Sequence, residues 1–448
     1  MALRSTLNPE LLMKSLIQTL SLALAITASV DPVKAQEELK HVDLITVLLL
    51  AGANHEDIAL AEARKREELA KSAQAWQRFW PSLSLGAGYR GHEGQVQDIA
   101  GAVFNASKQQ YTVGTSVLVD WAPGALWYGA LAAKQRARAA GSLTAKAKRD
   151  VLTQAACLYY DLLAQEAVVA IAQEDLQSLE SYEKQVSSAQ QSGARLRADV
   201  LRVRSQLSRW RVELRQVQEQ RGLAAAALTE ALRLPSATAL AAAKADLLPL
   251  ELIRLSEPLP ALVREAQQRR PEMEAAEALR QEARAKVDEA KKGPWVPSLQ
   301  AGYHMGGLGG GLGRQWGNFG GSQDFFLGLG WRLGSGGLGD RQRIVAEEAR
   351  RDAVDLQSQS LRSVIGREVV EAIERARSAR DQLKLQQEAG AAAREWMGLA
   401  REGQTSGVAL VLEYLMAQEE FSRARRGEVL SVAAYNKAQQ QLKRALGR

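Results

Sequence analysis

The stretch from Trp80 to Tyr89 reads Trp-Pro-Ser-Leu-Ser-Leu-Gly-Ala-Gly-Tyr and alternates apolar residues with small or polar ones. Successive side chains of a β-strand point to opposite faces, so this pattern predicts a strand with one apolar face over residues 82–90. A second alternating stretch over residues 111–120 predicts its antiparallel partner. A strand pair therefore lies near the start of the chain.

The same stretch returns later in a weaker form. Val-Pro-Ser-Leu-Gln-Ala-Gly-Tyr occupies residues 296–303, and Pro297 follows Pro81 by 216 residues. A second matching pair begins at Gly193 and Gly407, 214 residues apart. Two unrelated motifs with nearly the same offset indicate a tandem duplication, so further strands are expected over residues 298–305 and 323–333.

Each of these four segments has one apolar side and is about as long as a lipid-facing barrel strand. A soluble β-hairpin is the alternative interpretation. The residues predicted to face lipid are Leu83, Leu85, Tyr89, Val113, Val117, Leu299, Tyr303, Phe325, Leu327 and Trp331. An open sheet in lipid leaves edge N–H and C=O groups unpaired, and the smallest usual barrels have about eight strands. Four strands cannot close alone, so several copies must pool theirs.

The N-terminus has the pattern of a secretory signal peptide. Arg4 and Lys14 precede an apolar run over residues 16–30, and Ala35 ends a short segment that suits signal peptidase. We therefore predict a signal peptide over residues 1–35. A membrane anchor is the alternative, but the run is short for a spanning helix and polar residues interrupt it. No later segment has about 18 to 20 uninterrupted apolar residues, so membrane residence would have to use strands.

Long helices are permitted wherever proline is absent. No proline occurs between Pro123 and Pro235, or after Pro297. Helix-forming composition from Leu126 to about Gln190 predicts a rod on the order of 100 Å long. Apolar residues then recur with the 3-4 spacing of an antiparallel helix seam at Val200, Val203, Leu207, Trp210, Leu214 and Val217. The two segments predict a helical hairpin with its tip near residue 193.

The second half repeats this plan, with a hairpin tip near residues 403–407. Four prolines interrupt the pattern between residues 233 and 262. The chain is therefore divided into a first repeat over 36–232, a connector over 233–262 and a second repeat over 263–448.

The net charge of +7 is spread along the helical segments, so it indicates solvated helix surfaces and not a nucleic-acid site. Cys157 is the only cysteine, which excludes an intramolecular disulfide and a cysteine-based metal cluster. The four histidines are scattered, and neither a His-Glu-x-x-His motif nor a Gly-x-Ser-x-Gly motif is present. We predict no catalytic site, no metal site and no cofactor.

Two sets of motifs carry a family resemblance. One is Arg270-Pro271-Glu272, which opens an Ala-rich segment that ends at Pro297-Ser298-Leu299. The other is the pair of tip motifs ending in Asp199-Val200-Leu201 and Glu413-Tyr414-Leu415. With these motifs the sequence resembles the outer-membrane factor (TolC-like) efflux family over nearly all of the mature chain.

The resemblance implies an α+β membrane protein, mainly α, made of long antiparallel helical hairpins. It implies a homotrimer in which each subunit gives four strands to a shared 12-stranded β-barrel in outer-membrane lipid. It also implies a periplasmic helical tunnel that docks onto a periplasmic adaptor (membrane fusion) protein and an inner-membrane pump of the RND, ABC or MFS type. The chain would then be the passive exit duct of a tripartite efflux pump or a type I secretion system.

The resemblance also assigns roles to tip residues. Glu413 matches the first acidic position of the periplasmic pore entrance, and Asp199 matches the acidic residue of the first tip. Met416 departs from the second acidic position, and Ala409 replaces an arginine that some members use in an inter-helix lock. The residues expected at the adaptor-docking tips are Gly193, Leu196, Leu201, Gly403, Gly407, Leu410 and Leu415.

A ring of three Glu413 carboxylates at a narrow opening would favour cations and bind divalent ions. Alternatively, Asp199 and Glu413 merely cap or solvate the two turns. For the whole chain, the competing hypothesis is a periplasmic coiled-coil adaptor or scaffold that forms no channel.

Overall fold

The computed structural model describes residues 40–243, 247–312, 318–331, 340–405 and 410–448. The signal peptide predicted over residues 1–35 lies outside these residues, as do Gly407 and Ala409.

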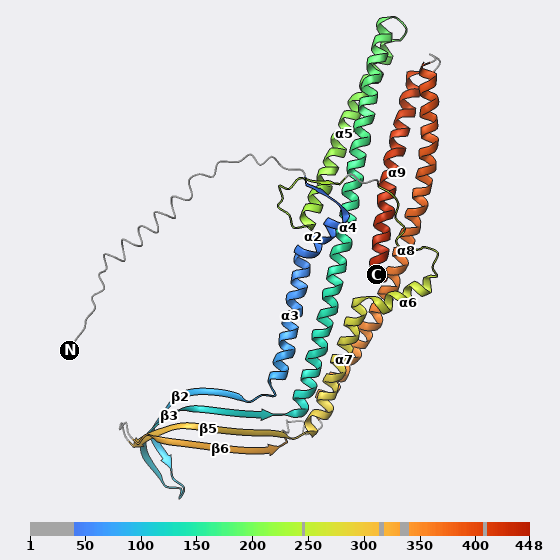
Figure 1. Cartoon of the computed structure of the whole chain (residues 1–448). Coiled ribbons are helices and arrows are strands. Elements are labelled where there is room, and N and C mark those ends of the chain that lie inside the picture. Colours follow the sequence, from blue (N-terminus) through green and yellow to red (C-terminus); the bar gives the residue numbers. More distant parts are fainter. Residues whose placement is uncertain (1–39, 244–246, 313–317, 332–339, 406–409) are drawn as a thin grey trace, which may run out of the picture.

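Two copies of one structural plan make up most of the chain (Figure 1). The first copy comprises α2 (Leu44–Asn54), α3 (Glu56–Gln77), β2 (Ser82–Gln97), β3 (Val103–Trp121), α4 (Pro123–Gln191) and α5 (Arg197–Ala231). The second comprises α6 (Leu259–Arg269), α7 (Pro271–Lys292), β5 (Ser298–Leu312), β6 (Gly320–Gly330), α8 (Arg341–Thr405) and α9 (Val411–Leu446). A 3-10 turn, η1 (Gly293–Trp295), precedes β5. Corresponding helices have nearly equal lengths: 11 and 11, 22 and 22, 69 and 65, and 35 and 36 residues. The tandem repeat predicted from the two offsets is confirmed.

The four long strands form one antiparallel sheet in the order β2-β3-β5-β6. The central pair, β3 and β5, joins the two repeats. β2, β3 and β5 are longer than predicted, while β6 begins before the predicted range and ends at Gly330. The ladder is made by backbone groups, so it continues through polar and glycine-rich sequence that lacks the apolar alternation. The alternation of apolar residues therefore predicted which face of each strand is apolar, but not where each strand begins and ends.

The long helices rise from one end of the sheet, and both hairpin tips lie far from it (Figure 1). α4 packs against α3 and α7, and also against α5 and α9. α8 packs against α6, α7 and α9. The seam predicted in α5 is confirmed for Val200, Val203, Leu207 and Trp210, which are buried, whereas Leu214 and Val217 are half-buried.

Side chains of α9 hold the connector in place. The backbone N–H groups of Leu250 and Ile253 donate to the side-chain oxygens of Asn436 and Gln439, at 2.8 and 2.9 Å. A short strand of the connector, β4 (Leu240–Ala242), pairs in parallel with β1 (Lys40–Val42). The proline-rich sequence is thus packed onto the helices, although its conformation is irregular.

The motif at Arg270 has a structural role in the second repeat. Arg270 is 3% exposed between α6 and α7. Its guanidinium donates to Glu368 of α8 at 2.6 Å and to Glu272 at 2.9 Å. Pro271 occupies the first helical position of α7, where a missing N–H costs nothing. A buried, doubly paired arginine therefore fixes where α6, α7 and α8 meet.

Two helical stretches are long and apolar enough by composition to cross a membrane, residues 44–77 and α4. The first consists of two helices that meet at His55, which caps α3. In α4, 56% of the most apolar window is buried inside the chain. Packing against neighbouring helices accounts for the apolar composition of α4.

Candidate functional site

The strand register places the predicted lipid-facing residues on one face of the sheet, except Trp331, which follows the end of β6. Leu83 lies opposite Val117, Val117 opposite Tyr303, and Tyr303 opposite Phe325. By the same register, the face also carries Leu85, Tyr89, Val113, Leu299 and Leu327. Leu85 is 78% exposed and Phe325 is 85% exposed, whereas Val117 and Leu299 are half-buried. One side of the sheet is thus an apolar surface that the chain does not cover.

The opposite face carries small and polar side chains. It includes Ser84, Ser116, Thr112, Gln300 and Asp324. Several glycines interrupt them, and Phe104, Leu118, Leu308 and Phe326 are among its large apolar members. A sheet with one apolar face and one small, polar face has the two-sided character of a barrel wall that separates lipid from water.

Tryptophans gather where the sheet meets the helices. Trp80, Trp295 and Trp331 adjoin the strand ends and are 77%, 65% and 57% exposed. Trp127 on α4 packs edge-on against Trp76 on α3, with ring centroids 5.7 Å apart. Exposed tryptophans at one level mark a membrane interface. Sequence reasoning identified only Trp331, although the others also lie within a few residues of a strand or a long helix end.

The hairpin tips expose leucines. Between α4 and α5 the chain turns at Gly193, whose φ of +82° suits glycine. Leu196 and Leu201 are 71% and 55% exposed, and Leu410, which precedes α9, is 67% exposed. These three positions are available to a partner.

Two other predicted docking residues differ from these exposed leucines, since Leu415 is buried and Gly403 is half-buried in the last turn of α8. Leu415 is 6% exposed, because it packs into an apolar cluster that joins the two hairpins. Gly403 lies within α8, which continues to Thr405, so the second turn begins later than predicted. The docking prediction is therefore wrong for Leu415, whose helical spacing puts it on the inward side of α9.

Asp199 and Glu413 lie in the first turns of α5 and α9. Asp199 is 3.7 Å from Arg202, and Glu413 is exposed and forms no ion pair within the described part of the chain. A carboxylate in a first helical turn also interacts favourably with the helix dipole. The geometry is thus compatible with both the entrance role and the capping role.

A buried charged network between the hairpins was missed at the sequence level. Asp175 of α4 is 5% exposed and accepts a hydrogen bond from Ser422 of α9. Burial raises the pKa of Asp175, although Ser422, Arg425 and Arg426 partly oppose this. Burial also lowers the pKa of Arg426, which pairs with Glu213 of α5.

The signal for this network was present in the sequence. Asp175 interrupts an apolar seam of 3-4 spacing that runs through Val168, Ala172, Leu179, Tyr182 and Val186. A carboxylate on such a seam is desolvated when helices pack, which is the condition for a shifted pKa.

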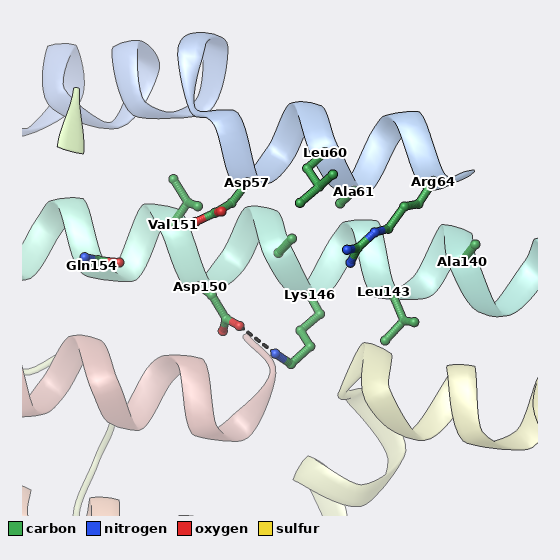
Figure 2. Close-up of a pocket in the computed structure, with 11 residues that line it drawn as sticks. Asp57, Leu60, Ala61, Arg64, Ala140, Leu143, Lys146, Asp150, Val151 and Gln154 are labelled. Atoms are coloured by element: carbon green, nitrogen blue, oxygen red, sulfur yellow. Dashed lines mark hydrogen bonds and ion pairs between the residues drawn. The ribbon is translucent and has the colours of Figure 1, made fainter. Parts of the chain in front are cut away.

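A groove of about 400 Å³ lies between α3 and α4 (Figure 2). It combines the leucines Leu60 and Leu143 with charged side chains, of which Lys146 pairs with Asp150 at 2.9 Å. Burial raises the pKa of Asp150, but hydrogen bonds from Arg444 and Lys146 outweigh it, so the pKa is lowered overall. None of the residues predicted from the sequence lies in this groove.

A family model described as outer membrane efflux protein matches residues 47–232 and 262–448. The chain belongs to this family. The two matched blocks coincide with the two structural repeats and omit most of the connector. As an outer membrane efflux protein, the chain is an outer-membrane duct for efflux and not an enzyme, because the family is one of passive channels.

Solved structures share the fold of this outer membrane efflux protein. A membrane protein from Pseudomonas aeruginosa is 20% identical, with a TM-score of 0.76 over 94% of this chain and 98% of that one. The CmeC outer membrane channel of Campylobacter jejuni is 15% identical, with a TM-score of 0.72 over 90% and 85%. The outer membrane protein VceC of Vibrio cholerae is 18% identical, with a TM-score of 0.71 over 90% and 96%. A search of curated proteins gave no match.

Proposed function

We propose that three copies of this chain pool their sheets into a 12-stranded barrel in the outer membrane and their helical hairpins into a periplasmic tunnel. The assembly is the exit duct of a tripartite efflux pump. A periplasmic adaptor and an inner-membrane pump deliver the substrate, and the duct conducts it passively to the exterior.

The single observation that carries this proposal is that the sheet has two open edges and an exposed apolar face. Among the described residues, β2 and β6 each have one strand neighbour, so each leaves one edge open. One face is apolar and exposed. Unpaired edges in lipid cost several kcal/mol per backbone group. Pairing β2 of one copy with β6 of the next removes both edges.

The hairpin tips supply the contact with the adaptor. Leu196, Leu201 and Leu410 are exposed apolar side chains at the end of the molecule far from the sheet. Burying each one against a partner would contribute roughly 1.5 to 3 kcal/mol. Cargo is chosen by the pump, so an RND, ABC or MFS pump, or a type I secretion exporter, would use the same duct.

Assembly is tested by purifying the mature chain from outer membranes in mild detergent. The proposal expects an oligomer of three chains that resists SDS until heated. A water-soluble monomer, extracted without detergent, would instead support a periplasmic adaptor or scaffold.

The entrance is tested by Glu413→Gln in planar bilayers. Three carboxylates at a narrow opening favour cations and bind divalent ions, so the variant should show a weaker cation preference and lose block by divalent ions. Asp199→Asn is the matched variant on the first hairpin. Unchanged ion preference and unchanged block in Glu413→Gln would leave Glu413 only the capping role.

A further inference from the structure

One row on the polar face of the sheet differs from its neighbours. Ser84, Ser116, His304 and Asp324 lie directly opposite one another across the four strands. The next row towards the hairpin loops consists of Gly86, Gly114, Gly306 and Ser322. The row on the other side contains the large residues Leu118 and Phe326. The imidazole and the carboxylate are therefore open towards the small row on the loop side.

The imidazole of His304 is held against the sheet. Its Nδ1 lies 2.8 Å from the hydroxyl oxygen of Ser116 on β3. A Cβ atom placed on Gly114 would lie only 2.8 Å from Cε1 of His304, so the ring occupies the space that this glycine leaves. Two residues of the neighbouring strand thus fix the position of the ring.

Asp324 of β6 lies directly opposite His304 of β5. Directly opposite residues of an antiparallel pair have Cβ atoms about 4.5 to 5.5 Å apart. The carboxylate accepts a hydrogen bond from Ser322 at 3.3 Å and is exposed. Within the described residues neither His304 nor Asp324 forms an ion pair, so no neighbouring charge of the chain neutralises either side chain.

We propose that His304 and Asp324 form a charge filter in the barrel of the duct, with small inorganic cations as the favoured solutes. The inference rests on the proposed trimer, in which the polar face lines the lumen and three copies of each residue stand at one level. With neutral imidazoles the row carries three negative charges, so it favours cations over anions. With protonated imidazoles the positive and negative charges balance, and the preference is lost.

Other charged groups on this face are few. β3 contributes Asp120 on one side of the row and Lys108 on the other, and β2 contributes Arg90 and His92. Histidine is the side chain that changes charge between pH 5 and 8, whereas carboxylates, lysine and arginine ordinarily keep theirs. On this face, His304 and His92 are the side chains of the type that changes charge in this range.

The experiment measures reversal potentials of the purified full-length mature channel in planar bilayers under a KCl gradient, from pH 8 to pH 5. For the wild type we expect the cation-to-anion permeability ratio to fall by about twofold as histidine becomes protonated. His304→Gln should abolish this fall, while the matched control His92→Gln should keep it. Asp324→Asn should lower the ratio at pH 8.

Each outcome is decisive. A fall that persists in His304→Gln, or a ratio at pH 8 that Asp324→Asn leaves unchanged, overturns the filter. A channel that conducts but shows neither effect refutes only the filter, whereas a wild type that forms no conducting oligomer refutes the duct itself. Migration as an SDS-resistant oligomer shows whether each variant has assembled before its conductance is measured.

Discussion

Large apolar side chains are buried in the helical rods but exposed on the sheet. In the rods, Leu179, Leu228 and Ile373 are at most 1% exposed, because helices of the same chain cover them. In the sheet, Leu85, Phe325 and Leu327 are at least 76% exposed. The rods bury these side chains within one chain, whereas the sheet needs lipid on one face and further strands at its edges.

The rods and the sheet also differ in whether their charged side chains form ion pairs. On the rods, charged side chains pair across helices, as Arg444 does with Asp150 at 2.7 Å and Lys437 with Asp161 at 2.5 Å. On the sheet, Asp324 and His304 form no such pair within the described residues. Charged side chains of the rods thus connect neighbouring helices, whereas those of this row of the sheet face the proposed lumen.

The largest effect should come from a charge on the apolar face of the sheet. Arginine at the bilayer midplane of a barrel costs about 2 to 4 kcal/mol per copy. With three copies, Leu85→Arg should abolish the SDS-resistant oligomer in outer-membrane fractions.

Ser84→Arg is the matched control, since Ser84 adjoins Leu85 but lies on the other face. It should assemble normally. Equal assembly of the two variants would contradict the assignment of the faces, and with it the contrast between sheet and rods.

A smaller effect is expected from a cavity in the rods. Leu228 of α5 is completely buried, so Leu228→Ala should lower the free energy of unfolding by about 2 to 5 kcal/mol. Thermal unfolding followed by circular dichroism in detergent measures it.

Leu223 lies on the same helix but is 57% exposed. Leu223→Ala should change the free energy of unfolding by less than about 0.5 kcal/mol. Equal losses of stability in the two variants would contradict the burial of Leu228 and the exposure of Leu223 on α5.

The smallest effect concerns the pH dependence of the rods. Because burial raises the pKa of Asp175 in the folded state, the folded chain keeps a proton that the unfolded chain releases at lower pH. Stability therefore falls as pH rises from the ordinary aspartate value to the raised one, and is constant above it. Asp175→Asn cannot titrate, so it should remove this fall.

The measurement is the midpoint of thermal unfolding between pH 4 and pH 8. Asp161→Asn is the control, because Asp161 is 41% exposed in its pair with Lys437. Its effect should stay below about 1 kcal/mol at every pH. A wild-type curve whose difference from that of Asp175→Asn does not change over this range would contradict the raised pKa of Asp175.

Much of the architecture could be read from local patterns. The alternation around Leu83 and Leu85 located the strands and their apolar face, and the absence of proline after Pro123 and Pro297 located the rods. Strand ends were not predictable, because β5 continues through Gly306 to Leu312 by backbone pairing alone. Leu415 was misassigned because distance from a turn says nothing about which side of a helix faces its neighbour.

The sequence by itself determined the duplicated plan, the period of each element and the apolar face of each strand, since these depend on side-chain order along the chain. Only the tertiary structure decided which strands pair, that α4 contacts both hairpins, and that Ser116, His304 and Asp324 share one row. Some of those relations, such as that between Ser116 and His304, join residues 188 positions apart. Packing and register, not local pattern, bring such residues together.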